Sequence, residues 1–117
     1  MSTIYHITTK DLWEKAKKAG VYTNPSIEEV GFIHCSTKGQ TVPTLNRRYV
    51  GKDDLLLLEL DPEKIEAKIK YEDLKGMGEE HPHVYGEIPL EAVVKAWKLE
   101  HADNGEFEFP DEEYEEE

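Results

Sequence analysis

The stretch DLLLLELD, residues Asp54–Asp61, is the strongest strand signal in the chain and decides its fold class. Four consecutive leucines are expected where a strand is buried on both faces, which places this strand in the centre of a sheet. Glu59 interrupts the apolar run, and a buried carboxylate is costly unless it is paired or borders a cleft. Asp61 precedes Pro62 and is expected to end the strand. We therefore predict a central strand that carries one carboxylate in need of a partner.

Upstream of this strand the sequence predicts short strands and helices. A helix is expected to begin after Thr8 or Thr9, which can cap it, and Ser26 with Glu29 predicts a second capped helical turn. Pro43 removes a helical hydrogen bond, so the regular part of the helix around it is expected to start near residue 41 or 42. The expected elements are a strand over 3–7, a helix ending at Gly20, a helical turn from 26, a strand over 31–36 and a helix over 37–49.

Downstream of the leucine run the chain is mostly β. Alternating apolar and polar residues predict strands over 67–71, 83–88, 93–100 and 106–109. The stretch LKGMGEEHP predicts a loop, ADNG predicts a hairpin turn, and Gly86 is expected to let another group approach the backbone closely. With helices early and about six or seven strands in all, the pattern is α+β, built on a mostly antiparallel, curved sheet.

Charge is distributed unevenly along the chain. The net charge is −12, and nine acidic residues from Asp103 onward, with no basic residue among them, leave only −3 for residues 1–102. We therefore predict one domain over 1–102 and a disordered acidic tail over 103–117, because such a segment repels itself and buries little apolar area. The body lacks the clustered basic face that duplex nucleic acid requires.

The bulk composition bounds the setting in which the protein works. The 117 residues suit a single core. No apolar run approaches the roughly 20 residues that span a bilayer, and the N-terminus lacks the pattern of a secretory signal. The single cysteine, Cys35, has no internal disulfide partner, as is usual in a reducing compartment. We expect a cytoplasmic monomer that has no membrane partner.

Three short apolar stretches hold four of the five histidines. His6 closes the first strand, His34 and Ser36 share one face of a later strand, and His83 and Tyr85 share one face of another. Because ligand groups converge where strand ends meet a cleft, we expect the three stretches to face one site. The candidate site residues, including a nearby pair of arginines, are His6, His34, Ser36, Arg47, Arg48, His83 and Tyr85.

Other chemistries fit these residues less well. A Cys–His nucleophile is disfavoured because Cys35 is expected to face away from His34 on the same strand. A small zinc-dependent hydrolase would draw on His6, His34 and His83, but no spacing in the chain demands a metal. No glycine-rich phosphate loop leads into a helix. Each histidine can also be a structural residue of its strand, and Ser36 can cap the helix that follows it.

Four segments in this order resemble one bacterial family. The segments YHITTKDLWEKAKKAG, GFIHCST, NRRYVGKDDLLLLELDPEKI and HPHVYGEIPLEAVV are similar to the family called domain of unknown function 952 (DUF952), over about Ile4 to Val94. That family is similar in turn to the ADP-ribosyltransferase fold, a split, curved, mostly antiparallel sheet with two or three helices. The resemblance implies this fold for the chain.

The resemblance also implies roles for individual residues. His6 occupies the place of the first-strand histidine that contacts the NAD ribose, His34 that of the residue near the nicotinamide, and Ser36 that of the serine that follows. The late catalytic glutamate of true transferases has no clear match, and Glu87 is only a distant candidate. RNA 2′-phosphotransferases of the same fold work with arginines and histidines around a phosphate, a pattern that the arginine pair of this chain fits more closely.

The sequence therefore predicts a cleft that binds NAD, as a substrate, or an ADP-ribose-like or phosphorylated nucleotide. Any reaction would transfer a ribosyl or phosphoryl group, with His34 and His83 as the catalytic residues. His6 and Tyr85 would hold the ribose, and the arginines would neutralise a phosphate. The alternative is a non-catalytic nucleotide- or protein-binding module that keeps the cleft. We expect no metal in either case.

Overall fold

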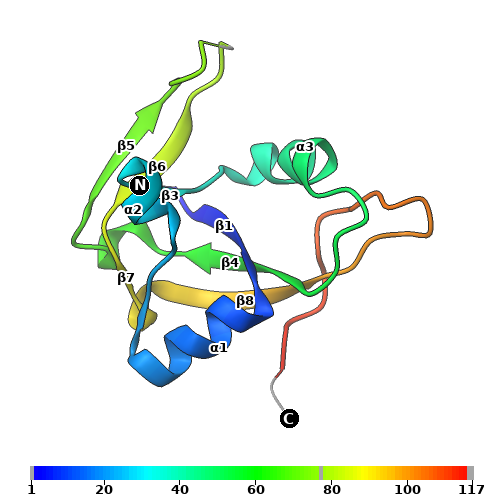
Figure 1. Ribbon diagram of the computed structural model, residues 1–117, viewed down its shortest axis with the longest axis horizontal. Helices are drawn as coiled ribbons and strands as arrows, with labels where there is room; N and C mark the ends of the chain where they lie inside the picture. Colours follow the sequence, from blue (N-terminus) through cyan, green and yellow to red (C-terminus); the bar gives the residue numbers. More distant parts are fainter. Residues whose placement is uncertain (1, 77, 116–117) are drawn as a thin grey trace.

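The computed structural model of the chain describes residues 2–76 and 78–115, and within them it has an α+β architecture of antiparallel sheets and three helices (Figure 1). The helices α1 (Lys10–Ala19), α2 (Ser26–Val30) and α3 (Lys38–Arg48) all precede the leucine-rich strand. Two short 3-10 turns, η1 (Pro62–Lys64) and η2 (Leu90–Ala92), follow it. The predicted α+β class is confirmed. In the described part of the chain, no helix combines the length and apolar character that crossing a membrane requires.

The leucine run forms the central strand of the main sheet, as predicted. β4 (Leu55–Leu60) pairs antiparallel with β1 (Ile4–Thr9) on one side and with β8 (Val93–Leu99) on the other. Its leucines are buried on both faces, in two separate hydrophobic clusters. One cluster contains Leu56, Leu58 and Leu60, and the other contains Leu55 and Leu57.

Glu59 has the partner that its place in this strand requires. Trp97 Nε1 donates a hydrogen bond to Glu59 Oε1 at 3.0 Å. Lys95 lies opposite Glu59 in the pairing of β4 with β8, and its Nζ lies 5.1 Å from the centre of the Trp97 ring. The carboxylate is therefore stabilised by neighbours on β8, which explains how a central strand tolerates it.

A second antiparallel sheet carries three of the candidate site residues, His34, His83 and Tyr85. Its order is β3 (Ile33–His34), β6 (His81–Tyr85) and β5 (Lys68–Glu72). An isolated bridge joins it to β1, where Tyr5 N donates to Ser36 O at 2.8 Å and Ser36 N donates to Tyr5 O at 2.7 Å. Figure 1 shows the β5–β6 hairpin rising away from the central sheet, with α3 across from it.

The stretch predicted as one strand over 83–88 is divided between two sheets. β6 begins two residues earlier than predicted and ends at Tyr85, while β7 (Ile88–Pro89) pairs with β2 (Val21–Tyr22). Pro82 does not prevent the early start, because its carbonyl accepts a hydrogen bond from Cys35 N at 2.9 Å. A proline lacks only the backbone N–H donor, so its carbonyl can still accept a hydrogen bond from the neighbouring strand.

α1 begins and ends as its sequence predicts, whereas α2 is capped differently. The Thr9 side chain accepts from Leu12 N at 3.2 Å, and Gly20 ends α1 in the left-handed region with φ 82°. Ser26 is not the cap of α2, because it is already helical and its own N–H donates to Asn24 Oδ1 at 2.9 Å. The amide of Asn24 therefore takes the role predicted for the serine hydroxyl.

α3 starts earlier than its proline suggests. The predicted regular start near residue 41 is wrong, since the helix begins at Lys38 and holds Pro43 inside it. Gln40 Oε1 accepts from Thr37 N at 3.0 Å, and Thr41 Oγ1 donates to Thr37 O at 2.9 Å. These bonds secure the first turn, so the lost proline donor does not unwind it. Thr37, and not Ser36, is the N-cap.

The hairpin turn before the acidic segment forms as predicted, but the strand after it does not. Gly105 N donates to Ala102 O and Ala102 N to Glu106 O, both at 2.9 Å. The predicted strand over 106–109 is reduced to one bridge between His101 and Phe107. Asn46 takes the place of a strand neighbour, because its side chain both accepts from Phe107 N at 2.7 Å and donates to Phe107 O at 3.0 Å.

The acidic segment is packed on the body, which corrects the prediction of a disordered tail for residues 103–115. Phe107 is only 2% exposed in the cluster that holds Leu57. Farther along, Lys98 N donates to Glu112 O and Tyr114 N to Ala96 O, both at 2.8 Å, so the segment pairs with the free edge of β8. Aromatic side chains spaced among the acidic ones bury enough apolar area to hold it. Residues 116 and 117 of the predicted tail lie outside the described residues.

Gly86 is a position of close approach, as predicted, and its replacement is a test of the packing. A Cβ at Gly86 would lie 2.8 Å from Ala67 Cβ. We expect Gly86→Ala to lower the free energy of unfolding by about 1–2 kcal/mol, because overpacking forces the backbone to shift. Urea denaturation measures the change, with Gly39→Ala as a control, since nothing lies within 4 Å of a Cβ there. Equal stability of the Gly86→Ala variant and the unchanged protein would contradict the expectation.

Candidate functional site

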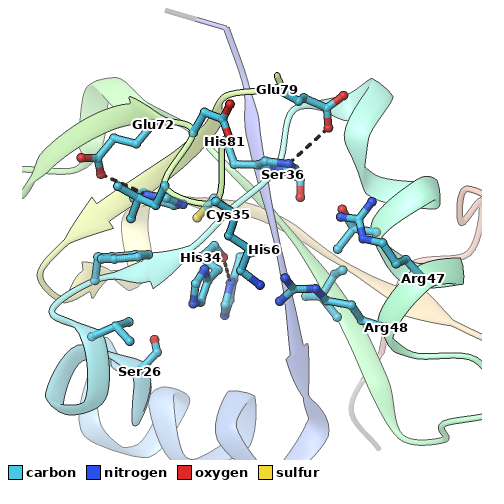
Figure 2. Close-up of a pocket in the computed structure, with 18 of the residues that line it drawn as sticks. His6, Ser26, His34, Cys35, Ser36, Arg47, Arg48, Glu72, Glu79 and His81 are labelled. Carbon is cyan, nitrogen blue, oxygen red and sulfur yellow. Dashed lines mark hydrogen bonds and ion pairs between the residues drawn. The ribbon is translucent and has the colours of Figure 1, made fainter. Parts of the chain in front are cut away.

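A cavity of about 800 Å³ lies between α3 and the β5–β6 hairpin, over a floor made by β1 and β3 (Figure 2). Figure 2 shows Arg47 and Arg48 entering from α3 on one side, with His6 and His34 held by strands beneath. The hairpin and its loop supply charged residues of both signs to the opposite rim. Six of the seven predicted site residues line this cavity: His6, Ser36, His34, Arg47, Arg48 and His83.

The strand wall of the cavity is a cluster of rings on one face of the second sheet. His34 and His83 are direct partners in the pairing of β3 with β6, and their ring centres are 5.6 Å apart. The Phe32 ring stacks on His83 with centres 4.1 Å apart and planes 22° apart, and it meets His34 edge-on at 4.8 Å. The alternation predicted for these strands thus brings both histidines to one surface, backed by a buried phenylalanine.

Glu72 is the carboxylate of the cavity that bonds to His83 and Tyr85. Its Oε1 accepts a hydrogen bond from Tyr85 Oη at 2.5 Å and lies 3.1 Å from His83 Nδ1. The bond from Tyr85 is the main reason that the pKa of Glu72 lies below its ordinary value, with His83 second, so the carboxylate stays charged. Tyr85 itself does not line the cavity and acts on it through Glu72.

His6 is fixed by a chain of hydrogen bonds that uses both of its ring nitrogens. Nδ1 lies 2.6 Å from the His34 carbonyl and therefore carries the proton, while Nε2 accepts from Tyr22 Oη at 2.7 Å. Tyr22 Oη in turn accepts from Thr8 Oγ1 at 2.8 Å and from Asn24 Nδ2 at 2.9 Å. His6 thus positions the backbone of His34, and neither of its ring nitrogens is free for the ribose contact that the sequence predicts.

Burial determines the protonation states of His6 and Tyr22 in this series of hydrogen bonds. The pKa of His6 is lowered to about 4, chiefly because the ring is removed from water, and burial raises the pKa of Tyr22 to about 12. Both groups are therefore neutral near neutral pH, as the direction of their hydrogen bonds requires. Each residue of this hydrogen-bonded network has a partner, which is the condition under which a buried polar network is stabilising.

His34 lies in positive surroundings. It is exposed at the cavity, yet its pKa is lowered, first by the loss of water on its inner side and then by the charges of His83 and Arg48. Lys75 and His81 add to this effect. A neutral imidazole among cationic groups can accept a proton, and the same groups favour an anion beside it.

The arginines of α3 face the cavity without partners of their own. Within the described residues, the side chains of Arg47 and Arg48 make no hydrogen bond or ion pair. The three acidic groups of the cavity have other partners. Glu72 pairs with His83, Glu79 Oε1 lies 3.2 Å from His81 Nε2, and Asp73 Oδ2 accepts from Gly78 N at 2.7 Å. Two adjacent guanidinium groups therefore remain open to an anionic ligand.

The thiol and metal alternatives find little support in the geometry. Cys35 is 4% exposed in the hydrophobic core, and burial raises the pKa of its thiol, which makes it a poor nucleophile. In the described part of the chain, no three His, Cys, Asp or Glu side chains are grouped so that they could hold a metal ion.

Several site residues were not predicted from the sequence. Phe32 carried a usable signal, because it shares the alternating face of His34. No sequence signal pointed to Glu72, because only the register of β5 on β6 brings it close to His83. The hydroxyl residues Ser26 and Thr44 line the cavity from α2 and α3, and only the packing of these helices reveals them.

Fold and site define a small α+β protein whose cavity is lined by aromatic rings and by charged side chains of both signs, and comparison with known proteins places it in a family. The chain matches the model of the family described as "Protein of unknown function (DUF952)" over residues 7–96, and it belongs to that family. The family predicted from the four sequence segments is thus confirmed.

Solved structures of protein CC0527 from Caulobacter crescentus are similar to this chain. The crystal structure has 27% sequence identity and a TM-score of 0.82, and the match covers 92% of this chain and 94% of that chain. The solution NMR structure has 25% identity and a TM-score of 0.71, with 91% of both chains covered. No curated protein matches the chain.

Proposed function

We propose that the cavity binds NAD or a related phosphorylated nucleotide of the ADP-ribose type. The observation that carries the proposal is the pair Arg47 and Arg48, whose guanidinium groups line the cavity without carboxylate partners among the described residues. Guanidinium groups match phosphate oxygens in geometry as well as charge. The positive surroundings of His34 extend this field across the floor of the cavity.

The size and the ring cluster of the cavity also suit a nucleotide. A volume of about 800 Å³ lies in the range of pockets that enclose drug-sized ligands, roughly 300–1,000 Å³. The rings of Phe32 and His83 stack on each other, are almost entirely buried, and lie behind the exposed imidazole of His34 in the cavity wall. A base or nicotinamide ring on this wall would leave the phosphates within the field of the arginines.

Any reaction at the site is a ribosyl or phosphoryl transfer in this proposal. His34 is the proton acceptor, because its lowered pKa keeps it neutral near neutral pH, and His83 is held in one orientation by Glu72. The resemblance to the ADP-ribosyltransferase fold favours ribosyl transfer, and the arginine pair favours phosphoryl transfer. We propose that the protein acts as a cytoplasmic monomer, with NAD as a substrate and without a metal.

A non-catalytic binding module is the second candidate. The observation in its favour is that Glu72, a carboxylate of the cavity, is already held by Tyr85 and His83, and that both ring nitrogens of His6 are engaged. Such a module would bind the nucleotide and release it without chemical change. Incubation with NAD or a 2′-phosphorylated RNA, followed by chromatography of the products, separates the two candidates.

An amide NMR titration of the ¹⁵N-labelled protein tests the proposal directly. The ligands are NAD, ADP-ribose and a nucleotide 2′-phosphate, each added to millimolar concentration. We expect saturable shifts confined to the second sheet, the floor of the cavity and the last turns of α3. The proposal fails if none of the three ligands shifts these signals.

Replacing the exposed histidine of the cavity is the first mutational test. We expect His34→Ala to weaken nucleotide binding by about tenfold or more, which corresponds to about 1.4 kcal/mol. The melting temperature should barely change, because the ring is exposed and the backbone carbonyl that holds His6 remains. Calorimetric titration and a melting curve measure the two effects, with His101→Ala, outside the cavity, as a histidine control. A large loss of stability with unchanged affinity would make His34 a structural residue.

A further inference from the structure

Two buried hydroxyl groups in the cavity wall have no hydrogen-bond partner. They are Ser26 Oγ on α2 and Thr44 Oγ1 on α3, and no other buried side-chain nitrogen or oxygen of the described residues is in this state. An unsatisfied buried polar group costs about 1–3 kcal/mol, and native proteins leave few of them. Two in the wall of one cavity therefore call for a physical reason.

Thr44 occupies the helix face that carries the arginines. It precedes Arg47 by three residues and Arg48 by four, which places the three side chains together on α3. A threonine inside a helix usually bonds back to the carbonyl four residues earlier, as Thr41 Oγ1 does to Thr37 O at 2.9 Å. Thr44 makes no such bond, so its hydroxyl is unused beside two guanidinium groups that are also without partners.

Ser26 is fixed on the other side of the cavity by the same network that holds His34. Ser26 N donates to Asn24 Oδ1, and Asn24 Nδ2 donates to Tyr22 Oη, both at 2.9 Å. Tyr22 continues the chain to His6 and the His34 carbonyl. The backbone of Ser26 is therefore set relative to His34, and the residue is only 9% exposed, yet its hydroxyl contributes nothing to this network. Figure 2 shows Ser26 on the side of the cavity away from the arginines.

We propose that Ser26 and Thr44 are ligand-binding hydroxyls on two walls of the cavity. Thr44 completes an anion subsite with Arg47 and Arg48, and Ser26 binds a hydroxyl or amide group at the far end of the same ligand. In the unliganded protein both oxygens are shielded from water. The proposed complex requires each side chain to rotate about χ1 to another staggered position that points its oxygen at the ligand. The inference rests on the proposed function and deepens it.

The class of ligand follows from this arrangement. One end must carry an anion with several acceptor oxygens, because two guanidinium groups and a hydroxyl donate to it. The other end must carry a polar group that a serine can bind near the ring cluster. A nucleoside diphosphate linked to a second sugar has both ends, whereas pyrophosphate has only the first.

Calorimetric titration of the full chain with pyrophosphate and with ADP-ribose tests the two subsites separately. We expect Thr44→Val, which keeps the shape of the side chain, to weaken binding of both probes by about tenfold. We expect Ser26→Ala to weaken ADP-ribose binding by a similar factor and to leave pyrophosphate binding unchanged. Thr44→Ser, which keeps the hydroxyl, should restore affinity, and Thr23→Val, at an exposed position outside the cavity, should have no effect.

The stability of the unliganded variants provides a second readout. Removing an orphan hydroxyl relieves an unsatisfied polar group, so Thr44→Val should melt at the same temperature as the unchanged protein or higher. A hydroxyl with a structural role would produce the opposite pattern, a lower melting temperature and unchanged affinity, and that result would overturn the inference. ADP-ribose binding that is unaffected by both substitutions would overturn it as well. If the unchanged protein binds neither probe, the proposed function itself fails.

Discussion

Phe107→Ala should lower the free energy of unfolding by about 4 kcal/mol, within the range that truncating a buried phenylalanine costs. Phe107 is 2% exposed and lies in the cluster that contains Tyr5, Leu45, Leu55 and Leu57. Its backbone is held at both polar atoms by Asn46. Neither the ring nor the backbone has room to rearrange, so the substitution leaves a cavity in a well-packed cluster.

Chemical denaturation of Phe107→Ala measures this loss, with Glu108→Ala as the matched control one residue away on the exposed side. The control should change stability by less than about 0.5 kcal/mol, as exposed substitutions usually do. The result bears on the whole acidic segment. A loss below about 1 kcal/mol, together with narrow and poorly dispersed amide signals from residues 106–115, would restore the disordered tail that charge alone predicts.

Acidification should destabilise the protein by about 3 kcal/mol through His6 alone. The pKa of the buried ring is lowered from 6.5 to about 4. At a pH between these two values, His6 therefore binds a proton in the unfolded chain but not in the folded protein. The stabilising contribution is therefore complete above pH 6.5 and is lost as the pH falls toward 4. A charged His6 would present a second N–H to Tyr22 Oη and force the tyrosine to give up the bond that it now donates.

Two other histidines modify this profile in opposite directions. The lowered pKa of His34 adds to the loss in acid. The pKa of His101 is raised, first by the Ala102 carbonyl and then by Asp53, so its contribution is present in acid and is lost as the pH rises through its folded value. Among these three histidines we expect His6 to contribute most, because it is the most deeply buried, and the lowered pKa of the Glu72 carboxyl adds to the loss in acid.

His6→Asn isolates the effect, because asparagine keeps a donor that can reach the His34 carbonyl but has no proton to gain. The free energy of unfolding, measured by urea denaturation from neutral pH to pH 4, should fall less steeply in this variant than in the unchanged protein. His101→Asn is a control with the opposite expected effect. It removes a histidine that stabilises the protein in acid, so the free energy of unfolding should fall more steeply with decreasing pH. Parallel profiles for His6→Asn and the unchanged protein would show that His6 does not titrate with a lowered pKa.

The strand pattern of the fold was predictable because it depends on local alternation and on burial. The leucine run identified the central strand without any knowledge of its neighbours. Alternation placed His34 with Ser36 and His83 with Tyr85, whereas the pairing of β3 with β6 is what brings His34 to His83. The start of α3 was missed because Gln40 and Thr37 secure the turn before Pro43, and capping by side chains outweighs a single lost donor. The acidic segment was misjudged because its net charge was weighed without the aromatic residues between the charges.

The sequence predicted most of the residues that line the cavity, but it predicted less well what each of these residues contacts. Six of the seven predicted residues line the cavity, whereas Tyr85 acts from behind it through Glu72. Glu72 could not be predicted, since only the register of β5 on β6 brings it to His83. His6 was predicted as a ligand contact, and the structure instead shows both of its ring nitrogens bonded within the protein, because the partners Tyr22 and the His34 carbonyl are remote in sequence.

The bridge between Tyr5 and Ser36 has a consequence for hydrogen exchange. Among the described residues it is the one backbone bridge between the second sheet and the main one, whereas β4 is paired along both of its edges. Amides of β4 are therefore expected to exchange only on global unfolding, whereas those of β5, an edge strand of the second sheet, are expected to exchange through a local opening at lower free energy. Such an opening would separate Glu72 from His83, while β6 stays in place through Val84, which is fully buried in the core cluster with Leu56 and Leu58. This gives a bulky ligand a route of entry that does not require global unfolding.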